Sequence, residues 1–144
     1  LIQTTPEHEF FKTLSTVRRV LEPELAYIAA STANEEDIER IKQAYEGMEK
    51  ATTVEEFIEP DIQFHLAIAK ATHNDLLAYM SKMLVLPLQQ SIQVTSLRPN
   101  LQGHSLPRHK AILTAIENKD PLSARHASLV QLDDTKMAYD LIKK

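Results

Sequence analysis

Apolar residues recur every three or four positions along most of the chain, and this spacing places them on one face of an α-helix. Capping residues at the ends of these stretches divide the chain into predicted helices. The expected ranges are residues 6–32, 35–51, 54–72, 75–97, 105–119 and 121–139 or beyond. Because the connections are short, the pattern predicts an all-α protein, an antiparallel bundle of six or seven helices.

Three features refine this outline. Pro23 and Pro60 lie inside predicted helices, where a proline ring removes a hydrogen bond and clashes with the preceding turn. We therefore expect a kink or break near Glu22 and a division of the third helix. The stretch 75–97 is long and nearly uncharged, so it should be central and largely buried. Residues 98–104, RPNLQGH, are predicted as a loop.

Composition limits the classes of protein that remain. With 144 residues the chain fits a single domain, residues 1–144. It has two glycines, which disfavours a sheet protein, and no cysteine, which excludes disulfides and thiolate metal sites. A net charge of -4 argues against binding of this segment to a phosphate backbone. Because the chain opens on Leu1 rather than Met, we expect it to be a fragment of a longer protein.

The sequence also lacks signals for a membrane or for secretion. No apolar run approaches the roughly 20 residues of a membrane span. The first residues, LIQTTPEHEFF, lack the basic start of a secretory signal. A cytoplasmic protein without membrane contact is therefore expected.

The stretch PDIQFHLAIAKATHN, residues 60–74, places Asp61 and His65 four positions apart inside an apolar helix. Residues at this spacing share a helix face, so an Asp oxygen and a His nitrogen can both reach one divalent ion. A solvated or mutually hydrogen-bonded pair has the same spacing. The residues alone leave both interpretations open.

Other polar residues lie on helix faces that should point inward. His109 shares a face with Ile112 and Ile116, where it is either a ligand or a satisfied core histidine. Arg18 lies four residues before Glu22 and is either a surface arginine or half of an intrahelical ion pair. In the last helix, a stripe of small and polar residues fits a polar cavity or a moderately exposed helix: Ala124, Ser128, Gln131 and Thr135.

Four blocks, VRRVLEPELAYIAA, DIQFHLAIAKATHN, RHKAILTAIENKD and PLSARHASLVQL, span nearly the whole chain. Together, and in this order, they resemble the C-terminal effector domain (FCD domain) of the FadR subfamily of GntR-type bacterial transcriptional regulators. The family's patterns are Arg-x-x-x-Glu, matched by Arg18 and Glu22, and Asp-x-x-Phe-His, matched by Asp61 and His65. The resemblance implies the helical bundle of the FadR C-terminal domain.

The resemblance also implies a ligand set. Asp61, His65 and His109 match three of the family's metal ligands, for which zinc or nickel is the expected divalent ion. Arg18 matches the first-helix arginine that reaches the carboxylate of the effector. Ser91, on the inner stripe of the fourth predicted helix, is expected to bond to an effector hydroxyl.

Two positions depart from the family's pattern. Arg108 stands where a glutamate often precedes the histidine, and Gln131 stands where the last ligand histidine is expected. An amide oxygen is a weaker ligand than imidazole. At this possible fourth ligand position, Gln131 therefore either leaves a coordination position vacant for water or the effector, binds the effector directly, or indicates that no metal is used.

From these residues and the resemblance we expect a ligand-sensing domain, not an enzyme. It should bind a small carboxylate, a sugar acid or hydroxy acid, beside a divalent metal ion. A homodimer is expected, with DNA bound only by an N-terminal winged helix-turn-helix domain that this fragment lacks. Two other classes stay open: a helical metalloenzyme that uses one Asp and two His, as non-haem iron enzymes do, and a structural dimerisation module with a dry interior.

Overall fold

The computed structural model describes residues 6–95 and 101–143, and within these ranges it contains seven helices and no strand. The predicted all-α fold is therefore confirmed. The helices are α1 (Pro6–Thr32), α2 (Glu35–Lys50), α3 (Val54–Lys70), α4 (Asp75–Met83), α5 (Val85–Thr95), α6 (Leu101–Glu117) and α7 (Pro121–Lys143).

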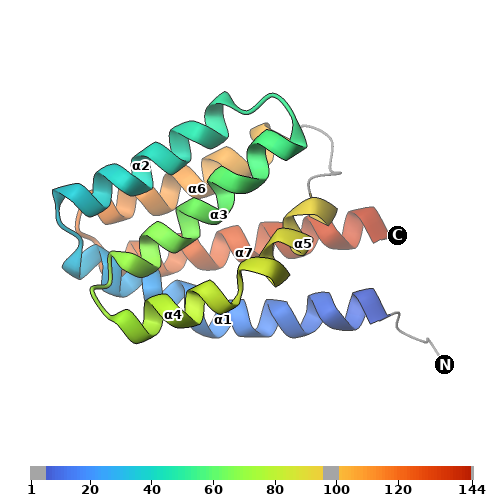
Figure 1. Cartoon of the computed structure of the whole chain (residues 1–144), viewed down its shortest axis with the longest axis horizontal. Helices are drawn as coiled ribbons and strands as arrows, with labels where there is room; N and C mark the ends of the chain where they lie inside the picture. The colour runs from blue at the N-terminus through green and yellow to red at the C-terminus, as the bar shows by residue number, and fades with distance from the viewer. Residues whose placement is uncertain (1–5, 96–100, 144) are drawn as a thin grey trace.

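The two longest helices, α1 and α7, run antiparallel along one side of the bundle (Figure 1). From there, α6 packs on α7, α2 packs on α6 and α3, and α3 returns to α1. The core lies inside this ring of five helices. The short helices α4 and α5 follow α3, and α5 contacts both α3 and α7.

Small side chains of α1 line the centre of the bundle. Ala26, Ala29 and Ala30 are at most 1% exposed, and they let neighbouring helices approach closely. The same cluster contains the large buried side chains of the other helices: Ile41, Met48, Phe57, Phe64, Ile112, Leu113 and Ile116. His109, at 1% exposed, is as deeply buried as these apolar residues. The imidazole of His109, a polar group, therefore lies in the deepest part of the core.

Pro23 and Pro60 do not divide their helices. α1 continues through Pro23 and α3 through Pro60, so of the kink or break expected near Glu22 the break does not occur, and the predicted division of the third helix is wrong. Each proline removes one backbone hydrogen bond. At Pro60 the burial of the flanking residues Phe57 and Ile62, which are 2% and 3% exposed, offsets this loss. Gly47 of α2 makes room for the second proline, since a Cβ there would lie 3.1 Å from the Pro60 ring.

The predicted helix 75–97 is two helices, because the chain leaves helical geometry at Leu84 with a ψ of 0°. In a continuous helix the ring of Pro87 would clash with the Met83 carbonyl, whereas a new start at Val85 puts Pro87 in a first turn. The expectation of a central, buried helix is wrong for α4: none of its 9 residues, all of them described, is buried. In α5 the buried residues are Leu88, Ser91 and Ile92.

The ends of three other elements also differ from the prediction, and the smallest difference is in α2, which ends at Lys50, one residue earlier than expected. α6 begins at Leu101, inside the predicted loop, while residues 98–100 lie outside the described part of the chain. α3 ends at Lys70, two residues earlier than expected. The last helix reaches Lys143, in agreement with its predicted range.

Asp37 joins the start of α2 to the turn between α3 and α4. Asn34 and Asp37 form a capping box, in which each side chain accepts a hydrogen bond from the other's backbone N–H, at 2.8 and 2.9 Å. Asp37 Oδ2 also lies 2.6 Å from His73 Nε2, in a turn where His73 has a left-handed φ of 56°. Burial opposes ionisation of Asp37, but the hydrogen bonds from Asn34 and His73 outweigh it and lower the pKa of this carboxyl.

We predict that Asp37→Ala lowers the free energy of unfolding by about 1–2 kcal/mol at neutral pH, because it removes the cap and the His73 contact. The folded-state pKa of Asp37 lies below its unfolded value. The stabilisation is therefore present above the unfolded pKa and is lost as the pH falls through the folded one. Urea denaturation at a series of pH values should show the difference from wild type shrinking in acid.

Asp75→Ala, in the exposed first turn of α4, is the control for this variant. It should change stability by less than about 0.5 kcal/mol. A loss for Asp37→Ala that stays constant into acid would contradict the role assigned to its carboxylate.

Candidate metal and effector site

Three side chains expected as metal ligands meet in the deepest part of the core. Asp61 and His65 lie one turn apart on α3, and His109 comes from α6. The Nε2 atoms of His65 and His109 each lie 3.1 Å from Asp61 Oδ1. One ligand atom from each of the three lies within 4.8 Å of the others. We call these three residues the Asp61 cluster, and their spacing admits one divalent ion.

The opposite nitrogen of each imidazole faces an oxygen acceptor. His65 Nδ1 lies 3.1 Å from Glu22 Oε1, and His109 Nδ1 lies 2.9 Å from the Ser105 carbonyl oxygen. A carbonyl only accepts, so Nδ1 of His109 carries a hydrogen; with that hydrogen in place, a neutral ring would present its Nε2 lone pair to a bound ion, in place of a hydrogen to Asp61. Histidine ligands of metals are commonly held by a carboxylate or carbonyl in this way. The donor set and its supporting acceptors therefore fit a divalent ion.

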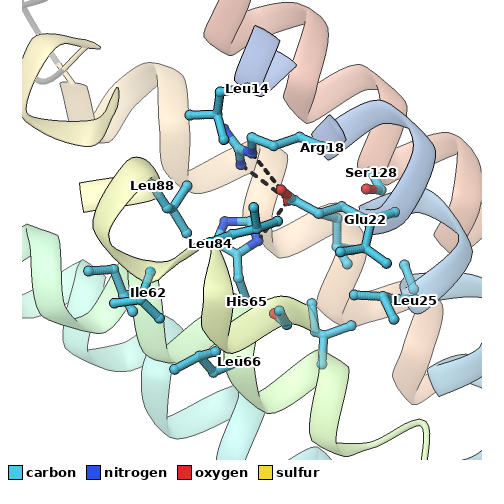
Figure 2. Close-up of a pocket in the computed structure, with 16 residues that line it drawn as sticks. Leu14, Arg18, Glu22, Leu25, Ile62, His65, Leu66, Leu84, Leu88 and Ser128 are labelled. Atoms are coloured by element: carbon cyan, nitrogen blue, oxygen red, sulfur yellow. Dashed lines mark hydrogen bonds and ion pairs between the residues drawn. The ribbon is translucent and has the colours of Figure 1, made fainter. Parts of the chain in front are cut away.

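Arg18 and Glu22 of α1 extend the cluster (Figure 2). Arg18 Nε lies 2.5 Å from Glu22 Oε2, and Arg18 Nη2 lies 3.1 Å from Glu22 Oε1. The intrahelical ion pair that the sequence allowed is formed, and both side chains are largely buried. A continuous chain of contacts therefore runs from Arg18 through Glu22 to His65.

Opposite charges offset the cost of burial in this group. Burial opposes ionisation of Glu22, but Arg18 and His65 outweigh it and lower the pKa of Glu22 to about 2. Burial also disfavours a charged His65, but Glu22 and Asp61 raise the pKa of His65 to about 9. Burial is again outweighed at Asp61, where His109 and His65 hold the pKa well below its usual range. A divalent ion would displace the His65 proton, because a histidine ligand must be neutral.

A small cavity, which we call the inner cavity, adjoins the Asp61 cluster. Its volume is about 30 Å³, which leaves room for one or two waters. Its lining includes Asp61 and His109 together with Arg18, Ser91 and Gln131. The structure thus places the residues expected to bind the effector beside two of the expected ligands.

A second cavity shares Arg18 with the inner cavity. Arg18, Glu22 and His65 form its polar wall, and the remaining lining is mostly leucine, isoleucine and alanine (Figure 2). Leu84 and Val85, at the junction of α4 and α5, belong to the apolar part of the lining. We call it the apolar cavity.

Sequence reasoning did not select three residues that support the site. The spacing predicts for Glu22 only a partnership with Arg18, although its place in the Arg-x-x-x-Glu pattern is a usable signal. Ser105 acts through its backbone carbonyl, for which no side-chain pattern exists. Thr135 was on the polar stripe of the last helix, and its Oγ1 accepts a hydrogen bond from Gln131 Nε2 at 3.0 Å.

Comparison with known proteins assigns the chain to a family. The sequence matches the FCD domain family over residues 13–134, most of the chain. The chain belongs to the FCD domain family. This confirms the resemblance found in the sequence.

Named relatives of this FCD domain are transcriptional regulators. The Uxu operon transcriptional regulator of Escherichia coli is 37% identical, across 85% of this chain and 51% of its own length. The galactonate operon transcriptional repressor of Escherichia coli is 30% identical, across 83% of this chain and 53% of its own. The chain thus spans about half the length of the curated relatives it matches. Their names agree with the prediction of a domain that is not an enzyme.

Solved structures share the fold of this FCD domain. Streptococcus agalactiae GntR superposes with a TM-score of 0.78 at 20% identity, covering 93% of this chain and 61% of that chain. E. coli McbR/YncC superposes with a TM-score of 0.77 at 17% identity, covering 99% of this chain and 71% of that chain. In the described part of the chain, no helix has the length and apolar character required to cross a membrane.

We predict that Glu22→Ala lowers the free energy of unfolding by about 3 kcal/mol, because it leaves Arg18 and His65 buried without their shared carboxylate. Urea denaturation measures the loss. Glu24→Ala is the matched control on the same helix: Glu24 pairs with Arg125 at 2.8 and 2.9 Å but is exposed. Its loss should stay below about 1 kcal/mol. Equal losses in the two variants would contradict the importance of burial at Glu22.

Proposed function

We propose that this chain is the ligand-sensing domain of a bacterial transcriptional regulator, which binds a small carboxylate beside a divalent metal ion. Asp61, His65 and His109 would hold the ion. The observation that supports this most strongly is the convergence of two Nε2 atoms on one carboxylate oxygen, with each Nδ1 engaged on the far side. Two imidazoles in the set favour zinc or nickel over magnesium or calcium.

A bound ion would supply positive charge and open coordination positions to an effector's oxygens. Formal charges support an anionic effector. With neutral imidazoles, a divalent ion and Arg18 contribute three positive charges, while Glu22 and Asp61 contribute two negative ones. A monocarboxylate would balance the remaining positive charge, and buried charges are stable only when they are balanced.

Arg18 is the proposed partner of the effector's carboxylate. Glu22 engages Nε and Nη2 of the guanidinium. This ion pair fixes the side chain and directs the donors that Glu22 does not use away from it. Because Arg18 also lines the inner cavity, those donors suit an anion bound there, and the cavity of about 30 Å³ must widen to admit an acid larger than one or two waters. Ser91, buried and on the same cavity, is proposed to bond to an effector hydroxyl.

Regulation would require a homodimer and a DNA-binding domain, proposed as a winged helix-turn-helix that precedes this chain in a cytoplasmic protein. The regulator names of its relatives support this. An effector changes DNA affinity only if it binds two arrangements of the protein unequally. Because Arg18 and Glu22 both lie on α1, this helix is the proposed connection between the site and the DNA-binding domain.

Metal binding can be measured directly. We expect the purified protein to retain about one divalent ion per chain by elemental analysis, and chelation to lower its melting temperature. Asp61→Ala and His109→Ala should lose the ion. His126→Ala, which removes an exposed histidine of α7, should retain it. A wild-type protein that takes up neither zinc nor nickel would overturn the proposed metal site.

The role of Arg18 in effector binding can be tested by screening small carboxylates for thermal stabilisation and then titrating the protein with the acid that stabilises it most. Arg18→Lys should weaken that acid about 10- to 100-fold, because lysine cannot reproduce the paired donors of a guanidinium, while metal content stays unchanged. Arg19→Ala, whose side chain pairs with Asp133 on the surface, is the control and should bind normally. An unchanged affinity in Arg18→Lys would contradict the role of Arg18.

A further inference from the structure

Gln131 of α7 has one amide atom bonded and the other without a partner. Its side chain is buried, with the residue 6% exposed. Nε2 donates to Thr135 Oγ1 at 3.0 Å. Oε1 is buried and has no hydrogen-bond partner among the described residues. Native proteins rarely leave such an atom unmatched, and a missing ligand is one explanation.

The orientation of this amide is set by Thr135. The Thr135 hydroxyl donates its hydrogen to the Gln131 backbone carbonyl oxygen at 3.1 Å. With that hydrogen used, Oγ1 can only accept, so the amide must present its NH₂ group to it. If the amide were turned over, its oxygen would face Thr135 Oγ1, and two acceptors would lie against each other. The oxygen of Gln131 is therefore the atom that remains for a ligand.

Gln131 lines the inner cavity with Asp61, His109, Arg18 and Ser91. An acceptor at this position is matched by a ligand that donates. A carboxylate has no hydrogen to donate, so an acid that displaces water from this cavity can match Oε1 only through another of its groups. A hydroxyl close to the carboxylate meets this requirement, whereas an oxo group would place a second acceptor against Oε1.

We infer that Gln131 determines effector specificity, by accepting a hydrogen bond from a hydroxyl next to the effector's carboxylate. The domain therefore prefers 2-hydroxy acids to the matching 2-oxo or unsubstituted acids. This rests on the proposed function, because it takes the inner cavity as the place where a carboxylate binds. It also distinguishes the two roles open to Gln131: the amide oxygen binds the effector and is not a fourth metal ligand.

The test uses calorimetric titration of the zinc-loaded chain with pairs of acids: lactate with pyruvate, malate with succinate, and gluconate with 2-oxogluconate. In the wild type, the hydroxy acid of the best-binding pair should bind at least about tenfold tighter. Gln131→Leu, similar in size but without an acceptor, should lose most of this preference. Its zinc affinity, measured by competition with a chelator, should stay within about threefold of wild type.

Thr135→Val provides a second variant that leaves Gln131 in place. Without the hydroxyl, the amide is free to turn and to offer its NH₂ group to an oxo acid. The ratio of the affinities for the hydroxy acid and the oxo acid should become smaller, again without a change in zinc affinity. Gln63→Leu, on the exposed face of α3, is the control and should keep the wild-type preference.

The outcomes separate this inference from the function on which it rests. If the wild type binds zinc and carboxylates but does not distinguish the members of any pair, the role of Gln131 is wrong and the sensing function stands. If Gln131→Leu weakens zinc binding more than tenfold and Gln131→His strengthens it, with the preference unchanged, Gln131 is a metal ligand and the inference is again overturned. If no carboxylate binds at all, both fail.

Discussion

The bundle is organised around one oxygen atom, Asp61 Oδ1, which faces two imidazoles at 3.1 Å each. A carboxylate in the centre of an apolar core is stable only when its charge and lone pairs are matched. Because the matching groups come from α3 and α6, this requirement fixes the distance between the two helices. Glu22 of α1 extends the constraint to a third helix through His65.

The apolar core alone would fix this arrangement less tightly. Alanine-rich faces such as that of α1 allow close packing, but one apolar contact is easily exchanged for another. Hydrogen-bonded groups have no such freedom, because their geometry must hold within a few tenths of an ångström. The same residues that suit a ligand therefore also define which helix faces meet. Site and fold are not separable in this domain.

Local features of the structure were predictable from the sequence. Asn34, Thr53 and Asn74 begin helices where expected, because a cap bonds to backbone groups two or three residues away. The Asp61–His65 spacing is equally local. His109 lies 48 residues from Asp61, so no periodicity connects them, and only the resemblance to a known family brought them into one ligand set.

Tertiary contacts determine the features that could not be predicted from the sequence. Pro23, Pro60 and Pro87 look alike as helix breakers, yet only Pro87 coincides with a new helix start. The difference depends on packing to either side of each ring, which the sequence does not state. The apolar residues of α4 similarly indicated burial, but they lie on an exposed helix. The acceptor behind His109 is a backbone carbonyl, which is invisible to any side-chain pattern.

The exposure of α4 has a consequence for kinetics. The junction of α4 and α5 forms part of the wall of the apolar cavity, beside Arg18 and His65. Moving α4 aside uncovers little apolar surface, so it costs far less than unfolding the core. If small molecules enter and leave through this wall, the stability of α4 would govern their rates. In the proposed sensing function, affinity would depend on the deep polar residues, so residence time and affinity could change independently of each other.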